Sequence, residues 1–330
     1  MNRRRKLVVA FGAGALMAPF ASFAQQPGKV WRIGYIDFGS RQSTLDSGRH
    51  GALIEGLREL GYVEGRNFVL EAHYADGDMD RVDGFAAELV RQKVDLILTL
   101  GSAASRAAQR ATATIPIVVI SSPDPVREGF AASLARPGGN LTGMSNGADD
   151  TVQKLVELLI AAAPKLNRVA VLINPANGAH ASLLSGVQAA ARKTGKLVLP
   201  VSVRAPDEIQ SRFATMARER ADALIILADA FFFQQRTQIA ALALKHRLAS
   251  IYALAGYAEA GGLMNYGSDN TDNFRRAGVF VDKLLKGAKP GELPFEQPVR
   301  YYLVINRKTA KALGLTIPQS LLISADKVIE

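Results

Sequence analysis

The chain has 330 residues, of which 48% are hydrophobic, with a formal net charge of +10 and no cysteine. Without cysteine the protein cannot form disulfide bonds or carry a lipid on an N-terminal cysteine, so its stability must come from a hydrophobic core. The basic residues are dispersed and do not interleave with aromatic residues, so the pattern differs from that of a nucleic-acid-binding groove. We therefore expect no nucleic-acid partner.

Residues 1–24 are predicted to be a signal peptide. Residues 3–6 are basic, residues 7–20 are apolar, and small residues at Ser22 and Ala24 favour cleavage after Ala24. The basic segment fits both a Sec signal and a loose twin-arginine signal. The apolar run is too short, and too interrupted by glycine and proline, to span a membrane well. We therefore expect a periplasmic protein without direct membrane insertion.

Strand and helix patterns alternate along the rest of the chain, which is long enough for two domains. In the first half we expect strands at 31–38, 68–74, 94–100, 115–120 and 141–145, and helices at 48–60, 79–92, 101–111 and 126–135. In the second half we expect strands at 168–173, 197–203, 223–227, 250–254, 263–266 and 301–305, and helices at 151–162, 181–194, 207–218, 233–246, 271–285 and 308–313. This alternation predicts parallel sheets flanked by helices.

The segment at residues 115–146 joins a predicted buried strand to a proline-rich turn. Its β-branched run ends at Pro123 and Pro125, which stop strand pairing and place Asp124 just past the carboxyl end of the strand. Ligands bind at that edge in open α/β sheets.

The same segment carries a family resemblance. Asp124-Pro125-Val126, with the run SLARPGGNLTG at residues 133–143, is similar to the signature of solute-binding proteins of ABC transporters. The better-known members of this family resemble the tryptophan-type amino-acid receptors of bacteria. Segments at 174–177, 260–267 and 306–315 match the family as well, in the expected order.

The resemblance implies an α/β, two-lobed, type I periplasmic-binding fold with three crossings between the lobes. Each lobe is then a parallel sheet flanked by helices. Residues 30–143 and 261–288 would form the first lobe, and residues 144–260 and 289–330 the second. The resemblance further implies a monomer that is not an enzyme and needs no cofactor. It would capture a small organic solute, such as an amino acid, by hinge closure and deliver it to the membrane permease of an ABC importer.

Candidate ligand-binding residues follow from this arrangement, because the ligand then lies between the carboxyl edges of both sheets. We list the residues at or just past strand ends and in the loops beside them. They are Phe38, Ser40, Gly101, Ser102, Ala103, Ser122, Asp124, Asn174, Asn177, Asp229 and Tyr257. For each serine, asparagine or aspartate the alternative is that it caps the following helix.

The chemistry of these candidates fits an α-amino acid. Residues 101–103 open a predicted helix, whose free N–H groups suit a carboxylate, and the Ser102 hydroxyl can add to them. Asp124 and Asp229 are acids that can hold an ammonium group. Phe38 and Tyr257 can form an aromatic wall, and the alternative for both is core packing.

Two other functions remain open from the sequence. Residues 143–147 match the G-x-S-x-G pattern of serine hydrolases, and Asp222 or Asp229 and then His246 follow Ser145 in the required order. This pattern is short and common by chance, and His246 falls within a helix pattern. The other alternative is a periplasmic ligand-sensing module. The four histidines are scattered without metal-ligand spacing, so we expect no metal site.

Overall fold

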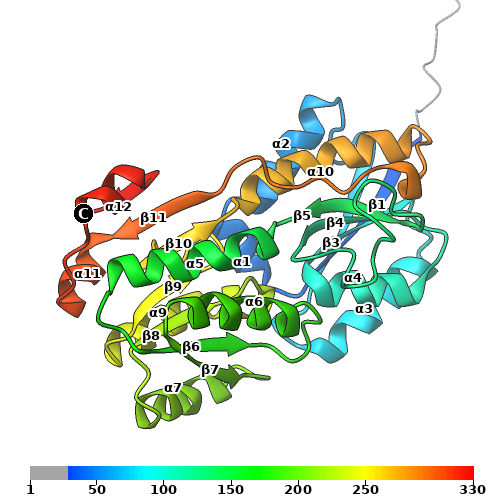
Figure 1. Cartoon of the computed structure of the whole chain (residues 1–330). Helices are drawn as coiled ribbons and strands as arrows, with labels where there is room; N and C mark the ends of the chain where they lie inside the picture. The colour runs from blue at the N-terminus through cyan, green and yellow to red at the C-terminus, as the bar shows by residue number, and fades with distance from the viewer. Residues whose placement is uncertain (1–28) are drawn as a thin grey trace, which may run out of the picture.

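The computed structural model describes residues 29–330, apart from the side chains of Asp46, Met79, Asp149, Asp150 and Asn270. The predicted signal peptide lies outside the described residues. The described chain forms two lobes, each built on one sheet with helices on both faces (Figure 1). Within residues 29–330, no helix is long and apolar enough to cross a membrane.

The first lobe contains a five-stranded parallel sheet in the order β2-β1-β3-β4-β5. Its strands are β1 (Trp31–Asp37), β2 (Phe68–Tyr74), β3 (Leu96–Leu100), β4 (Ile117–Ser122) and β5 (Leu141–Ser145). Its helices are α1 (Arg41–Asp46), α2 (Arg49–Glu59), α3 (Met79–Arg91), α4 (Gly101–Ala111) and, from much later in the chain, α10 (Asn270–Leu285).

Alternate residues of a central strand serve opposite layers of this lobe. Ile97 of β3 packs into the cluster that contains α3 and α4, whereas Leu98 packs with α2 and α10. Helices α2 and α10 cross at glycines, and a Cβ on Gly56 would lie 2.2 Å from the carbonyl oxygen of Arg275. This close backbone approach fixes α10 on the first lobe.

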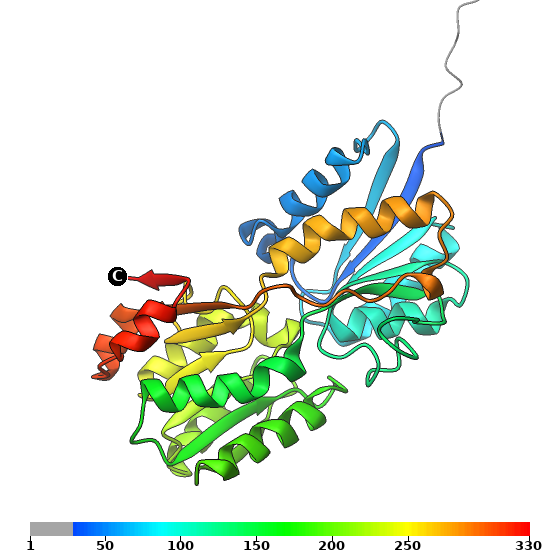
Figure 2. The same ribbon diagram turned by 45° about the horizontal axis from the view of Figure 1, so that its top comes forward.

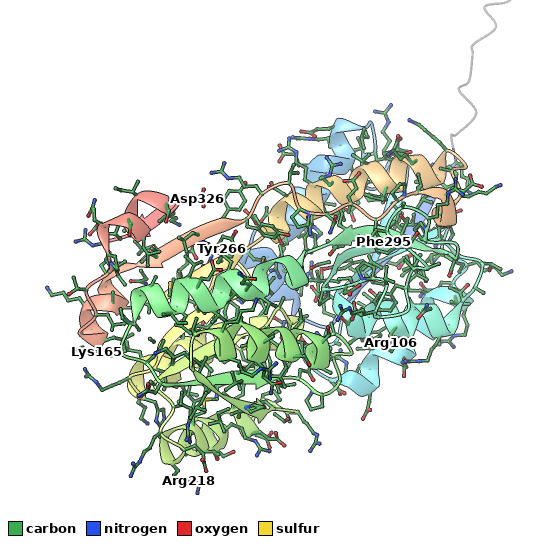
Figure 3. All side chains as sticks on the ribbon, viewed as in Figure 1. Arg106, Lys165, Arg218, Tyr266, Phe295 and Asp326 are labelled. Carbon is green, nitrogen blue, oxygen red and sulfur yellow. The ribbon has the colours of Figure 1, made fainter. Side chains whose placement is uncertain are left out.

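The second lobe contains a seven-stranded sheet in the order β12-β11-β10-β9-β8-β6-β7. Its strands are β6 (Arg168–Ile173), β7 (Leu197–Ser202), β8 (Ala223–Ile226), β9 (Ala249–Tyr252), β10 (Met264–Gly267), β11 (Tyr302–Asn306) and β12 (Lys327–Ile329). Its helices are α5 (Ala148–Ala162), α6 (His180–Lys193), α7 (Glu208–Arg218), α8 (Ala230–Gln234), α9 (Arg236–Lys245), α11 (Arg307–Leu313) and α12 (Gln319–Ser324). All neighbours are parallel except β10 and β11, which are antiparallel. Charged side chains such as Lys165 and Arg218 point outward from this lobe (Figure 3).

Three segments connect the lobes, as Figure 2 shows. The first runs from β5 to α5 and the second from β10 to α10. The third runs from a short 3₁₀ helix, η1 (Pro290–Glu292), to β11. The first two touch, since Ser268 Oγ donates to the carbonyl oxygen of Asn146 at 3.4 Å. The third contacts the first, because the Tyr301 hydroxyl donates to the carbonyl oxygen of Gly147 at 3.4 Å.

Two segments differ from the sequence-based expectation. Strand β10 pairs with β9 and β11 in the second sheet, so the chain leaves that sheet near residue 268 and not near residue 261. The helix expected at 126–135 is a series of turns. There the Asp124 carboxylate accepts from the N–H groups of Val126 and Arg127, and Gly129 takes a left-handed φ of +73°. These features prevent a continuous helical hydrogen-bond ladder.

Candidate functional site

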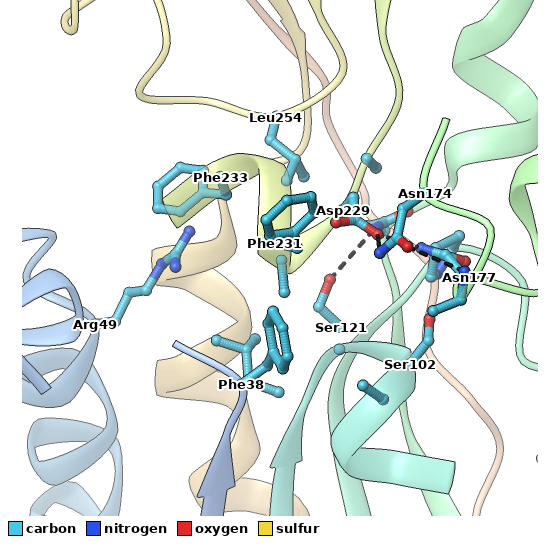
Figure 4. Close-up of a pocket in the computed structure, with 18 residues that line it drawn as sticks. Phe38, Arg49, Ser102, Ser121, Asn174, Asn177, Asp229, Phe231, Phe233 and Leu254 are labelled. Carbon is cyan, nitrogen blue, oxygen red and sulfur yellow. Dashed lines mark hydrogen bonds between the residues drawn. The ribbon is translucent and has the colours of Figure 1, made fainter. Parts of the chain in front are cut away.

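A cavity of about 50 Å³ lies between the carboxyl edges of the two sheets (Figure 4). Seven of the sequence-predicted site residues line it: Phe38, Gly101, Ser102, Ala103, Asn174, Asn177 and Asp229. The lining also includes Ser121, beside Ser122, and residues that the sequence reasoning missed, among them Arg49, Asn146, Phe231 and Phe233. Four candidates lie outside the lining: Ser40, Ser122, Asp124 and Tyr257.

Asp229 supplies the acid of the cavity. It follows β8 as the N-cap of α8, where its Oδ1 accepts from the Phe232 N–H at 3.1 Å. Its Oδ2 accepts from Asn174 Nδ2 at 3.1 Å and from Asn177 Nδ2 at 2.9 Å. The carboxylate is only 6% exposed and is held by three neutral donors. Helix capping and cavity lining therefore coexist in this residue.

His180 lies behind this acid but does not neutralise it. Its Nδ1 accepts from the Asn174 N–H at 2.9 Å, so the proton must be on Nε2, which lies 3.3 Å from the carbonyl oxygen of Ala228. Burial lowers the pKa of His180, although the charge of Asp229 acts in the opposite direction. The imidazole is therefore neutral. Among the described residues, Asp229 has no other basic side chain within ion-pair distance.

The N-terminus of α4 forms a second polar wall. Gly101 has a φ of +82°, which lets the chain turn directly from β3 into the helix, and no side chain caps that helix. Ser102 Oγ is buried next to the Glu128 carboxyl, but it forms no hydrogen bond of good geometry within the described chain. Free N–H groups and a free hydroxyl at a helix N-terminus suit an anion.

Asn146 belongs to the first crossing and contributes an acceptor. Its Nδ2 donates to Ser121 Oγ at 3.3 Å, whereas its buried Oδ1 has no hydrogen-bond partner among residues 29–330. An orphaned buried acceptor is costly unless a ligand or water completes it. Asn146 Oδ1 and Ser102 Oγ thus leave two unsatisfied polar atoms on side chains that line one cavity.

Aromatic rings from both lobes line the middle of the cavity. Phe38 follows β1 in the first lobe and meets Phe231 of α8 edge-on, with the ring centroids 6.4 Å apart. Phe233 meets the Arg49 guanidinium, whose central carbon lies 4.0 Å from the ring centroid. Burial lowers the pKa of Arg49, and the charge of Asp37 acts in the opposite direction. Tyr257 is 1% exposed and stacks on Tyr252 behind this wall.

The other three candidates outside the lining have local structural partners. Ser40 caps α1 by accepting from the Ser43 N–H at 3.1 Å. Ser122 Oγ donates to the buried Glu128 carboxyl. Burial raises the pKa of Glu128. Asp124 closes the turn that follows β4 and forms an ion pair with Arg127 at 2.9 Å. The capping alternative therefore describes Ser40, whereas Asp124 closes a turn that leads into no helix.

The hydrolase hypothesis is not supported by the geometry of Ser145. Its hydroxyl accepts from the Gly147 N–H at 3.0 Å and lies 3.5 Å from the carbonyl oxygen of Pro123. His246 lies at the end of α9 in the second lobe, where its ring contacts Phe213. No catalytic pair forms between these side chains. In the part of the chain that the structure describes, no group of three or more His, Asp or Glu residues could hold a metal.

Comparison with known proteins identifies the family. The sequence profile for "ABC transporter substrate binding protein" matches residues 40–329. The chain belongs to the family of ABC transporter substrate-binding proteins. This confirms the resemblance found in the sequence. The family consists of solute-binding proteins, not enzymes, and its members act outside the cytoplasm.

Individual relatives share both sequence and fold with this ABC transporter substrate-binding protein. A tyrosine-binding protein of Clostridioides difficile (strain R20291) is 26% identical over 272 residues, which cover 82% of this chain and 78% of the relative. The structure of an ABC domain from Streptococcus pneumoniae in complex with L-Trp has a TM-score of 0.84 at 28% identity. That match covers 91% of this chain and 100% of the other.

A third structure shares the fold. It is the ligand-free, open structure of a substrate-binding protein with adhesive properties from Clostridium difficile, with a TM-score of 0.65 at 24% identity. That match covers 91% of this chain and 99% of the other. The two-lobed periplasmic-binding fold predicted from the sequence is therefore confirmed.

Proposed function

We propose that this protein is the extracytoplasmic receptor of an ABC importer and that it binds an α-amino acid with an aromatic side chain. The observation that carries the proposal is the position of Asp229, an acid without a counter-ion among residues 29–330, across one cavity from the N-terminus of α4, which no described side chain caps. An α-amino acid presents an ammonium group and a carboxylate on a single carbon, so it requires an acid and an anion site close together.

Each group of such a ligand has a partner in the cavity. The ammonium donates to the Asp229 carboxylate and to Asn146 Oδ1, which lacks a partner in the described chain. The carboxylate accepts from the first N–H groups of α4 and from Ser102 Oγ. The side chain then lies among Phe38, Phe231 and Phe233, where an aromatic ring can stack or pack edge-on. The similarity to a tyrosine-binding protein and to a domain in complex with L-Trp supports an aromatic amino acid as the ligand.

Hinge closure between the lobes accounts for capture and release. The cavity of about 50 Å³ holds a few water molecules but is smaller than an aromatic amino acid, so the ligand enters when the lobes part. Asp229 and Phe231 belong to the second lobe, whereas Ser102 and Phe38 belong to the first. A ligand that contacts both lobes stabilises the closed state because the open state cannot offer both sets of contacts. The closed form then docks on the permease.

Thermal unfolding tests this function directly. The protein is first stripped of co-purified ligand by unfolding and refolding and then heated with single amino acids. A ligand at 100 times its dissociation constant adds about 2.7 kcal/mol to the free energy of unfolding. This raises the melting temperature by roughly 2–4 °C per kcal/mol. We expect shifts with L-tyrosine, L-tryptophan or L-phenylalanine and none with L-lysine or glucose. A folded protein that responds to none of the three aromatic amino acids would refute the proposal.

A further inference from the structure

Arg49 is a buried cation whose hydrogen-bonding capacity is unused. It is the first residue of α2, is 7% exposed and lines the cavity. Its planar guanidinium carries five N–H donors. Among the described residues it forms no hydrogen bond and no ion pair, and its guanidinium carbon lies 4.0 Å from the Phe233 centroid and 5.9 Å from the Phe274 centroid. Its N–H groups are therefore available to an acceptor in either of the two cavities that Arg49 borders, which can be water or a ligand atom.

The nearby acids do not supply that acceptor. Asp37 and, more weakly, Asp269 are close enough for their charges to favour the protonated form of Arg49, but neither carboxylate hydrogen-bonds it in the described chain. Asp37 has other donors. Its Oδ1 accepts from the Gly39 N–H at 2.6 Å, and its Oδ2 accepts from the Tyr35 hydroxyl at 2.9 Å and from Thr44 Oγ1 at 2.7 Å. The charge of Arg49 is therefore partly balanced, whereas its N–H groups still lack acceptors. A neutral oxygen can satisfy them.

The position of Arg49 indicates which part of the ligand it meets. In Figure 4, Arg49 lies on the far side of Phe231 and Phe38 from Asp229 and Asn177. The same figure shows Ser102 on the Asn177 side. The two groups assigned to the ammonium and the carboxylate thus share one end of the cavity, the rings occupy the middle, and Arg49 stands at the other end. A side chain that extends from the amino-acid end past the rings reaches Arg49.

We propose that Arg49 is a specificity-determining residue that hydrogen-bonds an oxygen at the distal end of an aromatic ligand side chain. The preferred ligand class is then a phenolic amino acid such as L-tyrosine, ahead of those with an unsubstituted ring. This inference rests on the proposed function, because it takes the amino-acid end of the ligand to lie at Asp229. Arg49 belongs to the first lobe and Phe233 to the second, so their stacking also holds the guanidinium in place when the cleft is closed.

Arg236 provides a matched control. Its guanidinium carbon lies 4.5 Å from the centroid of the same Phe233 ring, and its Nη1 donates to Ser43 Oγ across the lobes at 3.3 Å. However, Arg236 does not line the cavity that contains Asp229. It lines a neighbouring cavity of about 460 Å³, which Arg49 and Phe233 also border. The two arginines thus share a ring but differ in their access to the proposed ligand.

The test measures the affinity of purified, ligand-stripped protein for L-tyrosine and for L-phenylalanine by calorimetry. The comparison covers the wild type, Arg49→Met and Arg236→Met. The measured quantity is the ratio of the two affinities, so a general loss of binding cancels. We expect a preference for tyrosine of about 10- to 100-fold in the wild type, as for a hydrogen bond to a charged donor. This ratio should fall to about one in Arg49→Met and persist in Arg236→Met.

Other results would overturn the inference in distinguishable ways. If both ligands bind but the wild type shows no preference, or if the preference survives in Arg49→Met, Arg49 does not determine specificity while the proposed function stands. If neither ligand binds the folded wild type, the proposed function fails and the inference fails with it. Melting without ligand checks that each variant folds. Should Arg49→Met unfold, Arg49→Lys replaces it, since an ammonium lacks the planar fork and should also reduce the ratio.

Discussion

His180 Nε2 lies 3.8 Å from Asp229 Oδ2, yet the pair is not a salt bridge between opposite charges. The Asn174 N–H donates to Nδ1, so the imidazole carries its only proton on Nε2. The neutral ring and the two asparagine amides orient the carboxylate without balancing its charge. The carboxylate therefore has no cationic partner among the described residues, and a cationic group on the ligand can pair with it.

Replacing Asp229 with asparagine should abolish high-affinity binding. The substitution preserves shape and can still cap α8 but removes the charge that the ammonium group pairs with. Truncating one partner of a buried, hydrogen-bonded charge pair typically costs 2–5 kcal/mol, so we expect an affinity loss of at least about 30-fold. Calorimetric titration with the aromatic amino acid that gives the largest thermal shift measures this loss.

Asp124→Asn is the matched control for that experiment. Asp124 also follows a strand, but it serves a turn and an ion pair outside the cavity. We expect its affinity to stay within about threefold of the wild type, as for a distant surface change. A loss of binding in Asp124→Asn with unchanged binding in Asp229→Asn would reverse our assignment of the ammonium partner.

Replacing either of two glycines of α2 with alanine should change the stability of the protein, in opposite directions. A Cβ on Gly56 would lie 2.2 Å from the carbonyl oxygen of Arg275, so Gly56→Ala must push α2 away from α10 and should destabilise the protein by about 1–3 kcal/mol. A Cβ on Gly51 would meet no atom within 4 Å, and Gly51→Ala should stabilise the helix by roughly 0.5–1 kcal/mol. Denaturant unfolding compares them, and equal effects would contradict this packing.

Glu128 should make stability depend on pH. Burial raises its pKa from the ordinary value of 4.5, and this outweighs the hydrogen bond from Ser122, the nearby Ser102 hydroxyl and the charge of Arg106, which act in the opposite direction. The folded protein therefore keeps this proton at pH values where the unfolded chain has lost it. The resulting stability is complete below the ordinary pKa and is lost as pH rises through the raised one.

Glu128→Gln removes this contribution. We expect the variant to melt above the wild type at pH 8 and close to it near pH 4, with a flatter dependence between the two. Circular dichroism melts across that range measure the difference. If the gap between the two proteins did not change with pH, Glu128 would not be the group responsible.

The sequence was sufficient to predict the alternation of strands and helices and the edge at which the cavity lies. Residues just past strands, such as Ser102, Asn177 and Asp229, line the cavity because parallel strands end at a shared edge. The same rule could not separate Asp229 from Asp124. Asp229 leads into a helix, whereas the turns after Asp124, with left-handed Gly129, direct its carboxylate toward local N–H groups.

Arg49 and Phe231 could not be found from strand ends because neither is at one. Arg49 begins a helix, and its burial depends on Phe233, which belongs to the other lobe. Such contacts depend on how the two lobes meet, which a local sequence pattern does not encode. Strand β10 is short, and it belongs to the second lobe because it pairs with β9 and β11. The local sequence pattern does not reveal this pairing.

The most direct test of our account is the need for an ammonium group. Calorimetry of ligand-stripped protein should compare L-tyrosine or L-tryptophan, whichever gives the larger thermal shift, with the analogue that carries hydrogen in place of the amino group. We predict one-to-one binding of the amino acid and binding of the analogue at least about 30-fold weaker, because Asp229 then stays unpaired. Equal affinity for the two compounds would contradict the central role of Asp229.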